Sequence, residues 1–452
     1  MTTVRVRAAP KALTRLRDGV KPVVRWGIGH ALPRTVLRAA ARRGDLQARL
    51  VAEAAVSPTS ALTGLFDEIR AQGPLYEGSF AYVTTSHAAV REVLTGNDFR
   101  VGVGASDGVL ARLSEWSASD VLHPIAPPSL LATEPPDHTR YRKLVTRVFT
   151  VRAVETLRVR TEEIARELLD ALDPDASVDL VEAYCALLPV TVIAEILGVP
   201  PEERRRVLEL GAAAAPSLDL GLPWRQFRAV ESALADFDAW LGRHLDHLRA
   251  SPGDNLLSQL AAAQEDGVGL SDPELRATAG LVLAAGFETT VNLLGNGIAL
   301  LHDHPGELAA LRAEPSLWSN AVDEILRLDP PVLLTGRTCL RDTAVGGVRV
   351  PGGAVVTTIL AGANRDPAVF ADPARFDVGR ENAREHISFS AGRHYCLGAA
   401  LARMEGEVGL RALFDRFPDL RLLPGATRRR TRILRGFEHL PARLRGNPAG
   451  SS

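Results

Sequence analysis

Apolar residues recur at helical spacing over several long stretches of this chain. The longest stretch opens at Ser271–Glu274 (SDPE), which has the form of a capping box with a proline in the first helical turn. The apolar pattern continues to about His302 and predicts a helix about 45 Å long. Because this helix is apolar nearly all round, we expect it to cross the protein interior. A second, amphipathic helix is predicted from Leu397 onward.

Small and polar residues interrupt the middle of the long apolar helix. They form the run Ala285-Gly286-Phe287-Glu288-Thr289-Thr290. Glycine costs roughly 1 kcal/mol relative to alanine in a helix interior. Threonine can bond back to an earlier carbonyl and open the helix. Such residues indicate either a packing defect or a site that requires them.

One cysteine stands between two glycines in the segment Phe389–Gly398 (FSAGRHYCLG). Gly392 and Gly398 remove side chains on both sides of the sulfur, so the backbone can lie flat against something large. Cys396 sits at the predicted start of a helix, where the helix dipole favours a thiolate. A lone cysteine is more often an inert buried residue. A thiolate with open space in front of it, however, suits an iron ligand.

The segment Phe389–Gly398 resembles the cysteine-ligand loop of cytochromes P450, in which a Cys thiolate holds the haem iron. The resemblance implies haem b (iron protoporphyrin IX) as cofactor and Cys396 as the metal ligand. It also implies haem contacts by Phe389, Gly392 and Gly398. Ser390 departs from the pattern, since the family usually has glycine there. We expect the serine to tighten the turn without removing a haem contact.

Glu324 and Arg327 are spaced to share one helix face, in a stretch that ends before Pro330-Pro331. Taken alone, they could be an exposed ion pair worth a few tenths of a kcal/mol. In P450-like chains the same pair is buried and joined by a later arginine, and Arg375 matches that third position. The resemblance implies a structural role, in which a shared guanidinium fork locks the loop leading to Cys396.

The interrupted helix resembles the oxygen-binding groove of the same family. By that resemblance, Ala285 and Gly286 leave room for O2 and substrate over the haem. Glu288 and Thr289 match the acid–alcohol pair that handles protons, so they are the expected catalytic residues.

His138 and Arg142 lie four residues apart and therefore on one helix face. A histidine at a loop-to-helix junction is usually solvated or capping. This pair, however, resembles the P450 helix that binds the haem propionates. Arg337 and His394 match two further propionate contacts. Four such donors around two carboxylates would make charge-assisted hydrogen bonds.

The resemblance covers roughly residues 50 to 440 and is closest to soluble actinobacterial P450s. It implies a mainly α fold with small β-sheets, the single-domain cytochrome P450 fold. One domain is also required because motifs near residues 140, 288 and 396 must meet at one cofactor. We expect a basic N-terminal extension over residues 1–49, the haem domain over 50–445 and a flexible tail over 446–452.

Composition narrows the class of protein further. Three cysteines in 452 residues imply no disulfide framework and fit a reducing, cytoplasmic location. The net charge of −1 carries no nucleic-acid signature. We find no 18-residue apolar run and expect no transmembrane anchor. A zinc protein using His138, His394, Cys339 and Cys396 is an alternative without support from compact ligand pairs.

Positive charge is concentrated at the N-terminus, where residues 1–50 hold twelve Lys/Arg and two Asp. Such a segment could contact an anionic membrane surface peripherally or serve as a transit peptide. A partly disordered or helical extension packed on the body is the interpretation we favour.

The function implied is a haem-thiolate monooxygenase that inserts one oxygen atom from O2 into an apolar small-molecule substrate. Only 56 residues follow Cys396, so electrons are expected from a separate ferredoxin and ferredoxin reductase. A peroxide-driven peroxygenase and a non-catalytic haem-binding protein are the alternatives. Family resemblance places substrate lids in Val101–Leu131 and Ala212–Pro223. We expect the substrate pocket to be lined by Val282, Ala285, Leu333 and Leu334. The cations expected at the ferredoxin-docking surface are Arg140, Lys143, Arg384 and Arg393.

Overall fold

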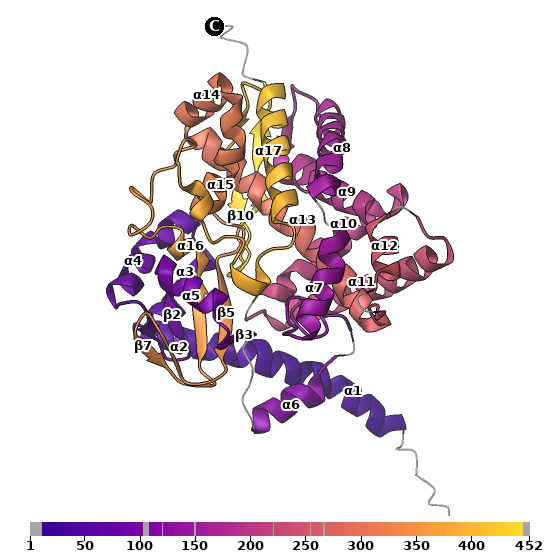
Figure 1. The fold of residues 1–452 in the computed structure, drawn as a ribbon, viewed down its shortest axis with the longest axis vertical. Coiled ribbons are helices and arrows are strands. Elements are labelled where there is room, and N and C mark those ends of the chain that lie inside the picture. Colours follow the sequence, from indigo (N-terminus) through magenta and orange to yellow (C-terminus); the bar gives the residue numbers. More distant parts are fainter. Residues whose placement is uncertain are drawn as a thin grey trace, which may run out of the picture.

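The computed structural model describes residues 11–102, 108–119, 121–148, 151–219, 221–253, 255–264 and 267–445. Helices form most of this part of the chain and surround a long central helix, while the larger sheet lies to one side (Figure 1). The mainly α fold with small β-sheets predicted from the sequence is confirmed.

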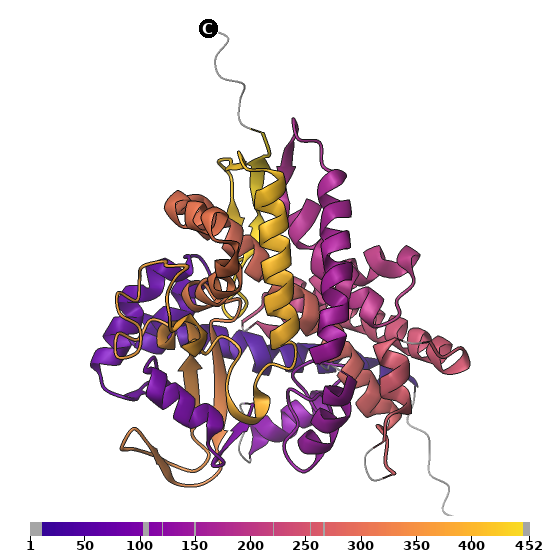
Figure 2. The ribbon, with the colours of Figure 1, turned by 45° about the horizontal axis from the view of Figure 1, so that its top comes forward.

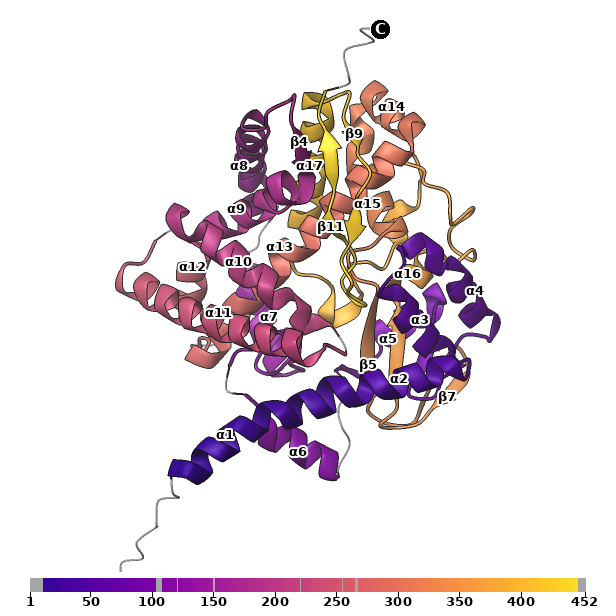
Figure 3. The same ribbon diagram turned by 180° about the vertical axis from the view of Figure 1, so that it is seen from behind.

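The N-terminal segment is helical from the first described residue. α1 (Lys11–Trp26), the π-helical turn η1 (Gly27–Ala31) and α2 (Leu32–Arg42) follow one another as a nearly continuous rod along one side of the molecule (Figure 3). α3 (Leu46–Ala54) then begins at Asp45, whose side chain accepts a hydrogen bond from Ala48 N at 2.8 Å. The basic segment is therefore helical over most of its described residues.

The predicted boundary between residues 49 and 50 runs through α3 and is wrong in detail. Leu46, Leu50 and Val51 on this helix belong to one buried cluster that also includes side chains of the larger sheet. Leu37 of α2 packs against the same cluster. A helix that contributes to the core cannot be divided between an extension and a domain. The tail proposed for residues 446–452 lies outside the described residues.

The larger sheet has five strands in the order β1-β2-β8-β5-β3. Only the β2–β8 pair is parallel, and the other pairs are antiparallel. The register pairs Val101 with Arg337 and Arg337 with Val356, which fixes Arg337 on an inner strand. The strands are β1 (Tyr76–Glu77), β2 (Tyr82–Thr84), β3 (Phe99–Val101), β5 (Leu334–Cys339) and β8 (Val355–Ile359), and a hairpin of β6 (Thr343–Val345) and β7 (Val348–Val350) lies between β5 and β8 in sequence.

Long helices form the other side of the molecule. α13 (Asp272–Asp303) begins with the capping box that the sequence predicts, since Ser271 and Glu274 each bond the other's backbone N–H. α17 (Ala399–Arg416) runs lengthwise beside α8 (Val151–Asp170) (Figure 2). α15 (Trp318–Leu328) packs on both α13 and α17. One large apolar cluster joins these helices, so the core lies around α13.

The remaining helices complete the fold. They are η2 (Thr59–Leu62), α4 (Thr63–Ala71), α5 (His87–Thr95), α6 (Val109–Ser117), α7 (Asp137–Val148), η3 (Val181–Cys185), α9 (Leu187–Ile196), η4 (Pro201–Glu203), α10 (Arg204–Ala214), η5 (Ala215–Leu218), α11 (Trp224–Ala250), α12 (Leu256–Ala262), α14 (Pro305–Ala313), η6 (Pro315–Leu317), α16 (Leu360–Ala363), η7 (Ala383–Glu385) and η8 (Gly392–His394).

Two small sheets contain the C-terminal strands, and one of them also contains a strand from the middle of the chain. β12 (Pro441–Arg443) pairs with β4 (Ser177–Asp179) and β9 (Arg421–Leu422), while β10 (Thr427–Arg428) pairs with β11 (Phe437–His439). By length and apolar composition alone, α13 could cross a membrane. However, 65% of its most apolar window is buried inside the protein, as in a central core helix. No membrane anchor is therefore evident among the described residues.

Candidate active site

Tight turns hold the loop that carries Cys396. The backbone N–H of Cys396 donates to Phe389 O at 2.9 Å, and that of Tyr395 donates to Gly392 O at 3.0 Å. α17 starts at Ala399 with Gly398 as its N-cap, slightly later than the predicted start at Leu397. The loop therefore places Cys396 just before the helix, as expected, and fixes its backbone from within.

The two glycines beside the cysteine have different roles. Gly392 has φ +68°, and a Cβ on it would lie 2.5 Å from Leu94 O at the end of α5. Its missing side chain therefore allows the loop to pack against α5, which corrects the expectation that it opens space for a cofactor. Gly398 has no atom within 4 Å of its Cβ position, so it faces open space.

Ser390 adopts φ +62°, a left-handed conformation that glycine adopts without strain. Its hydroxyl is buried and has no hydrogen-bond partner. The departure from the family pattern therefore carries backbone strain and an unsatisfied polar atom, whereas the sequence suggested only a tighter turn.

The Cys396 side chain is accessible although it lies deep within the protein. Burial raises the pKa of the Cys396 thiol, and the Gly398 N–H and the guanidinium groups of Arg142 and Arg403 lower it in part. Burial thus opposes the thiolate that the helix start favours. A cation bound to the sulfur, such as iron, would stabilise the thiolate.

The interrupted part of α13 combines an accessible face with local side-chain bonds. Ala285 is exposed in the middle of an otherwise mostly buried helix. Thr289 donates to Ala285 O at 2.8 Å, and Thr290 donates to Gly286 O at 3.1 Å. A Cβ on Gly286 would meet Ile193 of α9 at 3.3 Å, so Gly286 serves helix packing. Of the two small residues, only Ala285 opens onto free space.

Glu288 is buried, and its Oε1 lies 2.9 Å from Nη1 of Arg429, without hydrogen-bond geometry. Burial raises the pKa of Glu288, while Arg429 lowers it. A second acid, Glu405 of α17, is fully enclosed. Burial raises the pKa of Glu405 to about 8, although a hydrogen bond with Thr290 lowers it in part. The sequence analysis missed Arg429 and Glu405. An acid within the apolar pattern of the last helix was the available signal for Glu405.

Four predicted donors gather near the cysteine loop. His138 of α7 and His394 of η8 have ring centroids 4.4 Å apart, and their Nε2 atoms make no hydrogen bond within the described chain. Burial lowers the pKa of both histidines, that of His394 to about 4. Glu134 Oε1 lies 3.4 Å from His394 Nε2 and accepts from Val101 N at 2.6 Å.

Arg337 and Arg142 complete this group. Arg337 is buried and donates only to Thr335 Oγ1 and Gly336 O, with no carboxylate in ion-pair distance among the described residues. Burial lowers the pKa of Arg337 to about 10. Burial also lowers the pKa of Arg142, and Cys396 raises it. Incompletely satisfied cationic and imidazole donors beside an accessible thiol form a donor set that fits an iron porphyrin with two carboxylates.

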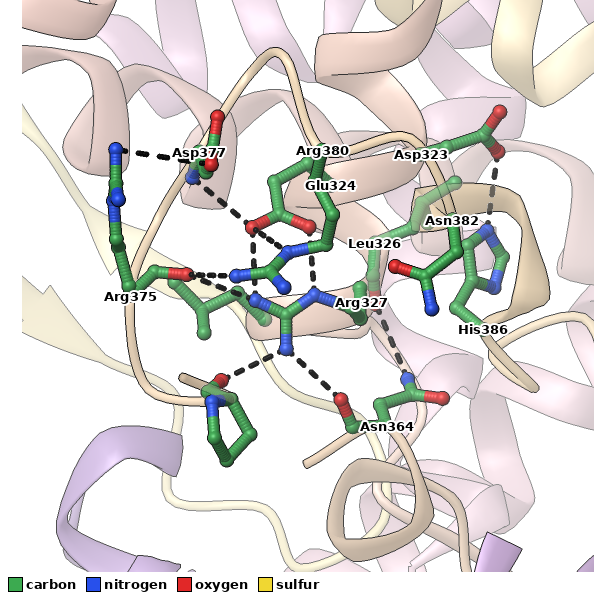
Figure 4. Close-up of polar contacts among 12 residues, drawn as sticks. Asp323, Glu324, Leu326, Arg327, Asn364, Arg375, Asp377, Arg380, Asn382 and His386 are labelled. Atoms are coloured by element: carbon green, nitrogen blue, oxygen red, sulfur yellow. Dashed lines mark hydrogen bonds and ion pairs between the residues drawn. The ribbon is translucent and has the colours of Figure 1, made fainter. Parts of the chain in front are cut away.

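Glu324 stands at the centre of a buried cluster behind the cysteine loop (Figure 4). Arg327 forms a bidentate pair with it at 2.6 and 2.8 Å and also donates to three main-chain carbonyls. The third member is Arg380, whose Nε donates to Glu324 Oε1 at 3.1 Å. The prediction that Arg375 takes this place is wrong. Its guanidinium is 64% exposed near Asp377, and only its carbonyl joins the cluster.

Asp323, next to Glu324, forms a second buried junction. It accepts from Arg403 Nε at 2.6 Å and from Arg384 Nε at 3.1 Å, and its Oδ1 lies 3.1 Å from His386 Nε2. Burial would raise its pKa, but the bonds from His386 and Arg403 bring the pKa of Asp323 below the ordinary value. The network ties α15 to α17 and to the segment before Cys396. It was missed because the partners lie far from Asp323 in sequence.

Two pocket predictions and two docking predictions also require correction. Leu333 is fully buried and Leu334 nearly so, both packed with the N-terminal helices, and they do not line a pocket. Arg140 is paired with Glu274 at 2.6 Å. Arg393 lies 3.1 Å from Glu134. Only 23% and 24% of these two side chains are exposed, so neither presents much charge at the surface.

Comparison with known proteins agrees with this geometry. The sequence model of the family "Cytochrome P450" matches residues 223–433. Cytochrome P450 140 of Mycobacterium tuberculosis is 52% identical over 432 residues, which cover 94% of this chain and 98% of that protein. The 6-deoxyerythronolide B hydroxylase of Saccharopolyspora erythraea is 44% identical over 70% of this chain and 77% of its own length.

A solved structure extends the likeness to three dimensions. The ligand-free Mycobacterium smegmatis CYP164A2 superposes with a TM-score of 0.76 at 34% identity, covering 88% of this chain and 99% of that one. From these matches, the chain belongs to the cytochrome P450 family, whose members bind haem b and act as monooxygenases.

Proposed function

We propose that this P450 monooxygenase inserts one oxygen atom from O2 into an apolar organic substrate beside α13, with electrons from a separate ferredoxin and its reductase. The observation that carries the proposal is the accessibility of Cys396 and Ala285, two side chains deep in the fold. An enclosed helix that exposes an alanine leaves room for a small reactant and an apolar substrate.

The donor set assigns the cofactor contacts within this proposal. Cys396 would be the iron ligand, and the propionates would be bound by His138, Arg142, Arg337 and His394. Phe389 supports the loop from beneath, where the Arg403 guanidinium lies 4.6 Å from its ring centroid. When bound, haem b supplies the iron that binds O2 and carries out the oxidation.

Proton handling would fall to α13. Burial raises the pKa of Glu288, so its carboxyl can retain a proton closer to neutral pH than an exposed glutamate does. Arg429, whose Nη1 lies beside Glu288 Oε1, opposes this rise in pKa. The Glu288–Arg429 pair therefore sets how readily the proton is released. The Thr289 hydroxyl already bonds Ala285 O on the accessible face, where it can still accept a hydrogen bond.

Two substitutions test the assignment of the site. Cys396→Ala should abolish the strongly red-shifted Soret band of the reduced carbon monoxide complex, while Cys339→Ala, a buried free thiol, serves as control. Thr289→Ala removes a hydroxyl but little volume, so reductant consumption should continue with more peroxide released per product. A thiolate spectrum in Cys396→Ala, or unchanged coupling in Thr289→Ala, would contradict the corresponding role.

The proposed docking face for ferredoxin is narrower than the sequence suggested. Arg384 is 70% exposed although its Nε bonds Asp323, and Lys143 of α7 is exposed. Tyr395, directly before Cys396, is also exposed and could contribute apolar contact. Cations beside an aromatic residue suit an acidic partner such as a ferredoxin, because complementary charge steers encounter.

Salt dependence tests the redox partner. Reduction of the enzyme by an acidic ferredoxin should slow as ionic strength rises, since steering is screened over about 10 Å at 0.1 M salt. Lys143→Glu should slow reduction at low salt, whereas Arg225→Glu, an exposed change at the start of α11, should not. Flat rates across salt with both variants, or full turnover with peroxide alone, would refute the ferredoxin proposal.

A cytoplasmic location is part of the same proposal. Cys185, Cys339 and Cys396 are all free thiols, which a reducing compartment maintains.

A further inference from the structure

The N-terminal rod lies across two segments that are far apart in sequence. α1 packs beside α6, and the end of α1 together with η1 reaches the corner between η5 and α11 (Figure 3). α6 and this corner belong to the two segments expected to cover the substrate site. Among the side chains that make the connection are Arg25, Trp26 and His30, and we call these three the clamp.

Arg25 bridges the two segments through polar contacts. Its Nε donates to Glu231 Oε1 of α11 at 2.7 Å, and its Nη1 donates to the carbonyl of Ser117 at the end of α6. Arg25 and Glu231 are both largely covered, and Ser117 is buried. One guanidinium therefore joins α6 to α11, although neither helix is its neighbour in sequence.

Trp26 and His30 hold the η5–α11 corner. Trp26 Nε1 donates to Leu222 O at 2.9 Å, and its ring meets that of Trp224 edge-on at 5.5 Å. Trp26 also packs against the apolar cluster formed by Ala214, Leu222, Phe227, Val230 and Leu234. His30 Nδ1 accepts from Leu222 N at 3.3 Å, and its ring lies 5.3 Å from that of Phe227. Both backbone polar groups of Leu222 are thus bonded by the N-terminal rod.

The clamped segments reach the central helix less than two turns before its accessible residue. Leu122, which follows α6, would lie 2.4 Å from a Cβ on Gly280 of α13, and Phe237 of α11 would lie 3.5 Å from the same point. Gly280 precedes the accessible Ala285 by five residues, about 7.5 Å along the helix axis, and points roughly 140° away from it around the helix. Separation of α6 from α11 would therefore loosen the packing on α13 between one and two turns from Ala285.

We propose that the clamp holds α6 and the η5–α11 corner together and so limits the rate at which bulky molecules reach the space beside Ala285. Arg25 and Trp26 are positioning residues in this role. The inference rests on the proposed function only in taking that space as the substrate site.

The variants can be chosen to leave the fold intact. Arg25→Met removes the bridge, and Glu231 keeps Arg228 at 3.5 Å, so no carboxylate is left isolated. Trp26→Phe keeps an aromatic ring but removes the N–H that bonds Leu222 O. Val23→Ala, on the same helix with a side chain 49% exposed, is the matched control. Arg25→Lys should keep part of the clamp's function, because lysine retains the positive charge beside Glu231.

Two measurements on the haem-loaded full chain test the clamp. Hydrogen–deuterium exchange should rise in residues 109–117 and 215–224 of Arg25→Met and Trp26→Phe. Stopped-flow binding of a bulky azole, ketoconazole, to the haem iron should become about fivefold faster in both directions, equivalent to about 1 kcal/mol in the barrier. Binding of imidazole should change less than twofold. Glu231→Gln removes the charge but keeps an acceptor oxygen for Arg25, so it should give a smaller increase than Arg25→Met, and the double variant should add little to Arg25→Met.

Ketoconazole rates in Arg25→Met and Trp26→Phe that stay within twofold of Val23→Ala would overturn the proposal, whatever the exchange shows. A rate increase shared equally by imidazole would also overturn it, because a clamp on the cover discriminates by size. Loss of the thiolate carbonyl band from the unmutated protein would instead contradict the proposed function, and the exchange measurement would still report on the clamp.

Discussion

Arg380→Ala should destabilise this protein strongly, while Arg375→Ala should leave its stability nearly unchanged. Arg380 donates to Glu324 Oε1 at 3.1 Å and to the carbonyls of Ala371, Asp372 and Arg375 at 2.7 to 3.3 Å, with only 8% of its side chain exposed. Arg375 uses only its carbonyl in the cluster, and alanine retains that carbonyl.

The expected magnitude follows from what each change leaves behind. Hydrogen bonds to charged groups contribute about 1.5–3 kcal/mol, and unsatisfied buried carbonyls add to the loss. Glu324 keeps its bidentate pair with Arg327 and the bond from Asp377 N, so the full cost of an isolated buried charge does not apply. We therefore expect about 2–4 kcal/mol for Arg380→Ala. For Arg375→Ala we expect less than about 0.5 kcal/mol, because its ion pair is exposed and 3.8 Å long.

Urea unfolding followed by tryptophan fluorescence would measure both variants, with the carbonyl spectrum as a second readout of the cysteine loop. Arg380→Lys should recover less than half of the loss, because an ammonium group cannot reproduce the planar fork. Equal destabilisation by Arg375→Ala and Arg380→Ala would refute the assignment of the third arginine. An Arg380→Ala variant as stable as the parent would refute the structural role of the Arg380–Glu324 contact.

Three further predictions concern the loop that carries Cys396 and the helix α17 that follows it. Ser390→Gly should raise the free energy of unfolding by about 1 kcal/mol, because it relieves a left-handed backbone and removes an unsatisfied hydroxyl; a loss of stability would contradict this. Gly392→Ala should lower the midpoint of urea unfolding, since its Cβ would collide with Leu94 O. Gly398→Ala should unfold like the parent but retain less haem on gel filtration, and equal unfolding of the two variants would argue against separate roles. Glu405→Gln should flatten the pH dependence of stability. The pKa of Glu405 is raised to about 8 in the folded protein, whereas in the unfolded chain it is about 4.3. Between these two pH values the folded protein binds more protons than the unfolded chain, so its stability falls by up to about 1.4 kcal/mol per pH unit as pH rises. An unchanged slope between about pH 6 and about pH 8 in urea titrations of the variant would show that Glu405 does not titrate there.

Features governed by short sequence separations were predictable from the chain alone. The capping box at Ser271 begins the central helix where the sequence places it, and Glu324 pairs with Arg327 as their spacing requires. Cys396 lies just before a helix, as the apolar pattern after it predicts. These relations hold because helix geometry fixes which residues three and four apart share a face, whatever surrounds the helix.

Only the tertiary structure decided which distant groups meet. Arg380 rather than Arg375 reaches Glu324, and Arg140 is taken up by Glu274. Gly392 accommodates α5, which the spacing around the cysteine could not reveal. The N-terminal rod ties α6 to α11 through Arg25, a contact that the charge of this segment alone did not predict. The type of a residue and its spacing from its neighbours determine which kinds of partner it can bind. The path of the backbone between elements determines which partner lies within about 3 Å, and that path is set by burial of the whole core.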